Sequence, residues 1–184
     1  MPWDEFIALQ FELVNSSTTD DCEYSGPFNT LMLNLFPPAS HYQVVPLPKR
    51  LHDSNEFSLF YIIKKGTTPI FFLQVKTAVA INCPALRKEA DEQMRDMFLE
   101  FASSCLAIPR LYGVSAMGTR VSVYEYTPSN RRLTPPRILP QLDVVTDVAP
   151  SERWQYDIME PQGEAKLKEL VAEIKEIANK SDWN

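Results

Sequence analysis

Three polar side chains near the middle of the chain have the types and spacing to form one chemical site. Glu56 opens a β-rich run, and the next β-rich run contains Gln74 and Lys76 near its end. Residues two apart on a strand point to the same face, so Gln74 and Lys76 are expected to be neighbours. A hairpin between the two runs would bring Glu56 beside them. A carboxylate, an amide and an ammonium group would then share one cleft.

The elements that would position these groups are a β-hairpin and the helix that follows it. The runs at residues 57–65 and 68–81 are rich in β-branched and aromatic residues. A helix is predicted over about residues 83–102. Its predicted apolar stripe consists of Leu86, Ala90, Met94, Met97, Phe98 and Phe101. Charged residues of this helix, such as Arg87 and Asp91, are expected mostly on its other faces.

The order of short segments around this site resembles the PD-(D/E)XK, or restriction-endonuclease-like, superfamily. The matching stretches are EYSGPFNTLMLNLFP, SNEFSLF, FFLQVKTA, EADEQMRDMF, PRLYGVSAMGTRVSVYEY and ERWQYDI. They also resemble a group of fungal, chiefly basidiomycete, proteins that share this core. The resemblance covers most of the chain and implies a restriction-endonuclease-like fold.

The resemblance also implies roles for individual residues. Glu56 stands where the superfamily has an Asp, Gln74 where it usually has Glu or Asp, and Lys76 matches its Lys. Glu23, ahead of the helix predicted over residues 27–36, and Gln93, on the helix after the hairpin, are additional candidates. These positions imply a Mg²⁺-dependent phosphodiester hydrolase, a nuclease, whose metal is held by Glu56 and Gln74. The Lys ammonium would orient the attacking water or stabilise the developing charge.

Two departures from the family pattern leave an alternative open. Glu56 is one methylene longer than Asp, and Gln74 lacks the negative charge of a carboxylate. A catalytically inactive nuclease-fold protein that serves as a protein-interaction module fits these departures. A kinase-like pairing of Lys76 with Glu89 or Glu92 on the following helix is a weaker alternative, because no glycine-rich loop, HRD or DFG accompanies it.

Nucleic-acid contacts would have to come from a local basic patch. The net charge of the chain is −6, whereas phosphate contacts favour basic proteins. The candidate contact residues are Lys64, Lys65, Arg131 and Arg132. The run VSVYEYT could be an edge strand that pairs across a dimer, which leaves the oligomeric state open.

The whole chain is predicted to form a single α/β (α+β) domain, with a central mixed β-sheet flanked by helices. Its expected parts are a helical N-terminal part, a nuclease-like core, a proline-rich extended wrap and a C-terminal helix, at residues 1–38, 40–127, 128–160 and 161–181. In the helix predicted over residues 4–14, Phe6, Leu9 and Leu13 share one apolar face, with Ile7, Phe11 and Val14 beside them.

Composition limits the class of protein. The 184 residues are 45% hydrophobic, which is ordinary for a globular domain. The three cysteines, Cys22, Cys83 and Cys105, fit neither a disulfide framework nor a zinc site, so buried thiols are expected. We find no signal peptide and no apolar run long enough for a membrane span, which predicts an intracellular protein of the cytoplasm or nucleus.

Overall fold

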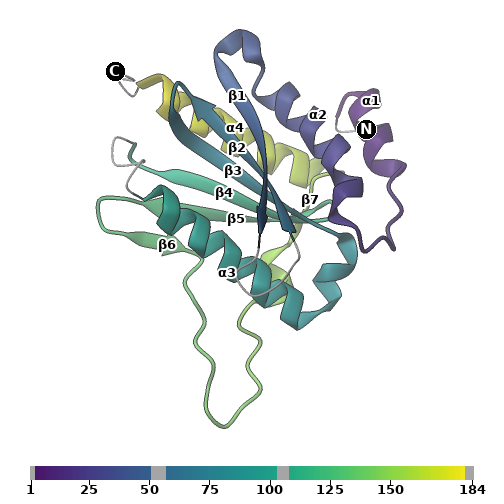
Figure 1. The fold of residues 1–184 in the computed structure, drawn as a ribbon, viewed down its shortest axis with the longest axis vertical. Helices are drawn as coiled ribbons and strands as arrows, with labels where there is room; N and C mark the ends of the chain where they lie inside the picture. The colour runs from purple at the N-terminus through teal and green to yellow at the C-terminus, as the bar shows by residue number, and fades with distance from the viewer. Residues whose placement is uncertain (1–2, 51–56, 103–107, 181–184) are drawn as a thin grey trace.

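The described part of the chain is an α+β fold built on one mixed, seven-stranded sheet with four flanking α-helices (Figure 1). The computed structural model describes residues 3–50, 57–102 and 108–180. The α-helices are α1 (Glu5–Glu12), α2 (Ser25–Leu35), α3 (Pro84–Phe101) and α4 (Pro161–Lys180). The strands are β1 (Tyr42–Arg50), β2 (Phe57–Lys65), β3 (Thr68–Lys76), β4 (Leu111–Met117), β5 (Arg120–Thr127), β6 (Arg132–Thr134) and β7 (Tyr156–Asp157).

Sheet topology decides which strand ends meet. The strand order is β1-β2-β3-β4-β5-β6, and β7 pairs with β5. Only the β3–β4 pair among these strands is parallel, and α3 forms the crossover between its two members. Because β3 and β4 are parallel, their carboxyl ends lie side by side at the same end of the sheet. Gln74 is therefore paired in register with Ser115, and Lys76 with Met117.

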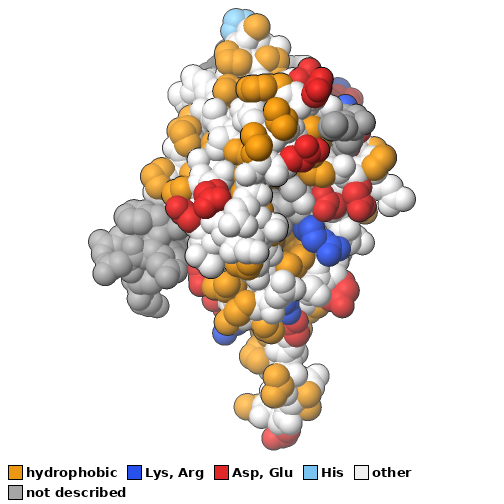
Figure 2. All heavy atoms as spheres, turned by 90° about the vertical axis from the view of Figure 1, so that its right-hand side faces the viewer, with side chains coloured by type: hydrophobic (Ala, Val, Ile, Leu, Met, Phe, Trp, Pro, Cys, Tyr) orange, Lys and Arg blue, Asp and Glu red, His pale blue; other side chains and the backbone are white. Residues whose placement is uncertain are grey.

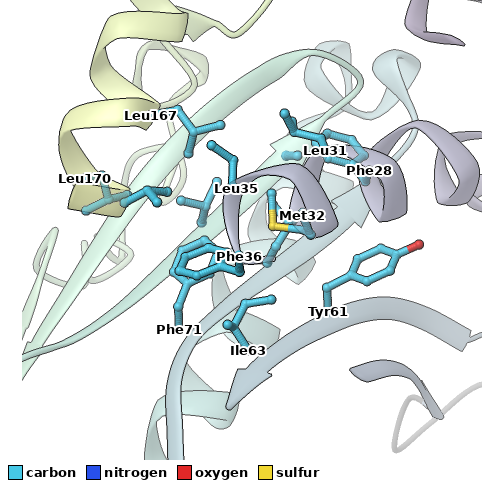
Figure 3. Packing of buried hydrophobic residues seen from close by; sticks show 14 of the residues in the cluster. Phe28, Leu31, Met32, Leu35, Phe36, Tyr61, Ile63, Phe71, Leu167 and Leu170 are labelled. Carbon is cyan, nitrogen blue, oxygen red and sulfur yellow. The ribbon is translucent and has the colours of Figure 1, made fainter. Parts of the chain in front are cut away.

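The two faces of the sheet carry separate apolar cores, which explains why β3 is apolar throughout residues 69–73. On one face, α2 and α4 pack over β2 and β3 (Figure 3). This cluster includes Phe28, Leu31, Met32, Leu35, Phe36, Ile63, Phe71, Leu167 and Leu170. On the other face, α3 packs over the sheet through Phe60, Phe72, Met94, Met97, Phe98 and Tyr124. Burying each such side chain stabilises the fold by about 1.5–3 kcal/mol.

The second hairpin strand is shorter than the sequence predicts. It ends at Lys76, and residues 78–82 form a 3-10 helix, η3 (Ala78–Asn82), where a continuous strand was expected. The backbone N–H of Thr77 donates to the side chain of Asp21 (2.7 Å), so it does not continue the strand pairing. The strand therefore stops beside a carboxylate from the N-terminal part of the chain.

The prediction of which α3 side chains are buried is partly wrong. Leu86 is 39% exposed, whereas Arg87 and Asp91 are buried. Asp91 accepts hydrogen bonds from Arg95 Nε (2.8 Å) and from Arg153 Nη1 (2.8 Å). The segment before α4 packs onto α3 here and contributes Arg153, which pairs with Asp91. A charged face of α3 is therefore buried.

Two smaller expectations also change. β5 pairs with β4, β6 and β7, so it is not the free edge strand that a dimer would need. Cys22 is exposed and Cys83 is partly exposed, contrary to the expectation of buried thiols, while Cys105 lies outside the described residues.

Within the described residues, no helix has the length and apolar character needed to cross a bilayer.

Candidate functional site

Lys76 lies at the carboxyl end of β3 between two carboxylates. Its Nζ is 3.4 Å from Glu89 Oε1 on α3 and 3.8 Å from Asp21 Oδ2. Asp21 begins the 3-10 helix η1 (Asp21–Tyr24), which leads into α2. Only 12% of the Lys76 side chain is exposed. The carboxyl end of β3 thus holds an ammonium group between carboxylates from two different elements.

Burial makes the carboxylate of Asp21 costly to ionise. Desolvation is the main cause that raises the pKa of Asp21 above its ordinary value. The charge of Lys76 and the N–H of Thr77 act in the opposite direction, while the charges of Asp20 and Glu89 add to the increase. A cation that bound here would favour the ionised form, because it would add positive charge to a partly desolvated acidic site.

Gln74 is fully buried on the same face of β3, and both ends of its amide are hydrogen-bonded. Ser115 Oγ donates to Gln74 Oε1 (2.8 Å), and Gln74 Nε2 donates to Gln93 Oε1 (2.7 Å). Gln74 has 0% exposed surface. Its amide therefore connects β4 to α3.

The hydrogen bonds continue from Gln93 towards Lys76. Gln93 Nε2 donates to Glu89 Oε1 (2.7 Å), and Trp154 Nε1 donates to Ser115 Oγ (3.3 Å) at the far end. We call the series Trp154, Ser115, Gln74, Gln93 and Glu89 the polar chain. Every donor in it points towards Glu89. No described, buried side-chain nitrogen or oxygen lacks a hydrogen-bond partner. The buried atoms of the polar chain therefore all have partners, and the hydrogen bond from Gln93 holds Glu89 in place.

The structure brings together some of the residues singled out in the sequence. Lys76, Gln74 and Gln93 lie in one connected set. Glu56 lies outside the described residues, so its place beside Lys76 stays a prediction. Glu23 is exposed and accepts a hydrogen bond from Thr18 (2.8 Å), and the acid that the N-terminal segment contributes is instead Asp21, as described above.

Two site residues were missed for different reasons. Asp21 belongs to the same acidic segment as Glu23, but the sequence does not say which acid of that segment faces the sheet. Ser115 carries no motif, and only the parallel pairing with β3 places it opposite Gln74. Glu89 was visible in the sequence only through the kinase-like pairing with Lys76.

The four basic residues considered for phosphate contact lie away from this site. Lys65 is at the opposite end of β2 from Ser58, whose hydroxyl bonds Gln93, so about 23 Å of strand separates them. Lys64 is next to it. Arg131 and Arg132 lie at the β5–β6 turn, the end of β5 opposite the one that pairs with the carboxyl end of β4.

The possible metal ligands near Lys76 fit a hard divalent cation only in part. Mg²⁺ accepts one or two carboxylates and keeps several waters. Asp21 and Glu89 offer two such carboxylates, whereas the Gln74 oxygen is already used by Ser115. No set of three or more His, Cys, Asp or Glu arranged to hold a metal occurs in the described ranges. A cation here would therefore depend on water and substrate oxygens for its remaining ligands.

Comparisons with known proteins do not add to this description. No protein family model, curated protein or solved structure matches the chain.

Proposed function

We propose that the chain is a Mg²⁺-dependent phosphodiester hydrolase of the PD-(D/E)XK type. The observation that carries this proposal is the Lys76 ammonium held between two carboxylates at the end of β3. The order of elements from α2 to β4, three antiparallel strands followed by a crossover helix and a parallel strand, supports a restriction-endonuclease-like core. Nucleic acid is the corresponding substrate class.

Each residue of the site has a task in this proposal. Asp21 and Glu89 would hold the cation in place of Gln74, because the Gln74 amide is engaged inside the protein. Glu56 lies outside the described residues and stays a predicted further ligand. The cation would supply an activated water and neutralise charge on the phosphate. Lys76 would stabilise negative charge that develops on the phosphate oxygens. Gln93 orients the Glu89 carboxylate through its hydrogen bond.

A second candidate is a catalytically inactive nuclease-fold protein that serves as an interaction module. The burial of Gln74 favours it, because position 74 has become part of a satisfied internal hydrogen-bond network. In this case Asp21, Lys76 and Glu89 would form a structural ion-pair cluster that closes the edge of the sheet.

An activity assay with matched lysine variants separates the two. The protein is incubated with single- and double-stranded DNA and RNA, with Mg²⁺ or Mn²⁺ or with a chelator. We expect cation-dependent cleavage that falls by about 100-fold or more in Lys76→Met. Lys88→Met removes a lysine whose side chain is 57% exposed, on α3, and should keep full activity. Absent cleavage, or equal cleavage by wild type and Lys76→Met, would reject the hydrolase.

Cation binding provides a second measurement. In the hydrolase, Mn²⁺ should raise the thermal midpoint of the wild type, and Asp21→Asn should remove most of this increase. No stabilisation by Mn²⁺, or equal stabilisation of Asp21→Asn, would instead support the inactive module.

A further inference from the structure

The helix α1 has apolar side chains on two sides, and only one of them is buried. Ile7, Ala8 and Phe11 pack into the core. Phe6, Leu9 and Leu13 lie on the surface with 65%, 48% and 76% of their area exposed. We call these three residues the α1 stripe. Their i, i+3, i+7 spacing aligns them along about 10 Å of helix. Isolated exposed apolar residues are common, but an aligned row on one helix is typical of an interaction surface.

The net negative charge of the chain comes from the same N-terminal part. Residues 1–48 contain no Lys or Arg and six acidic residues, Asp4, Glu5, Glu12, Asp20, Asp21 and Glu23. The rest of the chain holds 18 acidic and 18 basic residues, so the net charge of −6 comes entirely from residues 1–48. Figure 2 faces this side of the molecule, where apolar side chains (orange) lie among acidic ones (red).

The acids closest to the α1 stripe in sequence are not neutralised within the described part of the protein. Glu5 and Glu12 are exposed on α1 itself, and Asp4 caps its first turn by accepting from the N–H of Phe6 (3.0 Å). None of these three carboxylates forms an ion pair with a described residue. The α1 stripe is therefore bordered by carboxylates that no described residue neutralises.

We propose that the α1 stripe docks a basic amphipathic helix of a partner protein. An apolar face with Lys or Arg beside it matches the surface in both hydrophobicity and charge, and amphipathic helices commonly bind in this way. A second copy of this chain would bring two acidic surfaces together, and an anionic membrane would repel them. Docking at this surface does not require chemistry at Lys76.

The test uses the full chain and a fluorescein-labelled amphipathic peptide of leucine and lysine, followed by fluorescence anisotropy. Two control peptides have the same leucines with glutamate in place of lysine, or the same composition in a scrambled order. We expect the chain to bind the Leu/Lys helix at least about tenfold more tightly than either control, with affinity that falls as salt rises. Equal binding of the scrambled peptide would overturn the proposal, because charge alone would then explain it.

Variants locate the binding surface. The triple substitution Phe6→Ser, Leu9→Ser, Leu13→Ser should weaken binding by about tenfold or more. The matched control is Leu142→Ser, Val144→Ser, Val145→Ser, which removes three apolar side chains that are 104%, 60% and 102% exposed elsewhere on the surface, and it should bind as the wild type does. All six positions are exposed, so the variants should fold, and circular dichroism checks this.

Other occupants of the α1 stripe predict different results. Self-association of the wild type in sedimentation that is lost in the α1 triple variant would identify a second copy and overturn the proposal. Binding to phosphatidylserine vesicles that is lost in the same variant would identify a membrane and overturn it equally. Loss of peptide binding in the Leu142, Val144, Val145 variant would place the site elsewhere.

Discussion

The substitution Gln74→Glu tests whether the amide at this position is an integral part of the fold. The change replaces an N–H₂ donor by a carboxyl oxygen without a change of shape. In the wild type this donor lies 2.7 Å from Gln93 Oε1, which also accepts from Ser58 Oγ (2.8 Å). Gln93 cannot reverse its amide without loss, because its Nε2 donates to Glu89. An ionised group at position 74 would therefore point one oxygen at another, without access to water.

The expected cost depends on pH. A buried carboxyl without a cation has its pKa raised far above the unfolded value of about 4.3. Below pH 4 the carboxyl group at position 74 is protonated, and its O–H can donate to Gln93 as the amide does. The substitution should therefore not lower the free energy of unfolding there. Stability is then lost at about 1.4 kcal/mol per pH unit as pH rises from the unfolded pKa towards the raised folded one. At pH 7 the loss relative to wild type should be about 3–4 kcal/mol.

Urea unfolding of wild type and Gln74→Glu between pH 4 and pH 8 measures this difference. Gln43→Glu makes the same chemical change at an exposed residue of β1 and should stay within about 0.5 kcal/mol of wild type at every pH. A loss below about 1 kcal/mol at pH 7, or a loss that does not depend on pH, would refute the reasoning about the polar chain. Recovery of stability on addition of Mg²⁺ would show that a carboxylate at position 74 completes a cation site.

Three further predictions follow from buried groups. Asp91→Asn leaves two arginines without their carboxylate and should lower the free energy of unfolding by about 3–5 kcal/mol in urea titrations; a loss under about 1 kcal/mol would contradict the buried network. Gly163→Ala places a Cβ 1.8 Å from a backbone oxygen of β7, so it should lower the thermal midpoint, whereas Gly26→Ala on α2 meets no atom within 4 Å and should leave it equal or higher. Burial raises the pKa of Tyr61 and Tyr112 to about 12, so their favourable contribution is present below pH 10 and is lost as pH rises through about 12. Absorbance titration should find both ionising about two pH units later in the folded than in the unfolded protein, and ionisation near pH 10 in the folded protein would contradict this.

The sequence by itself determined the features that depend on local periodicity. The β-branched and aromatic runs at residues 57–65 and 68–81 predicted the β2–β3 hairpin, and a two-residue spacing was enough to place Gln74 and Lys76 on one face. The apolar repeat after the hairpin predicted α3, and its Gln93 does meet Gln74. These inferences succeed because backbone geometry fixes the relation between residues a few positions apart.

Only the tertiary structure decided relations between distant segments. Asp21 reaches Lys76 because η1 packs against the end of β3, and no pattern in the sequence distinguishes it from Glu23. Helix α1 shows the same limit, since its sequence has two apolar faces of similar strength and the packing against α2 buries only the one with Phe11. Periodicity says that a face is apolar, but which face is buried, and which charge it meets there, depends on segments that only folding brings together.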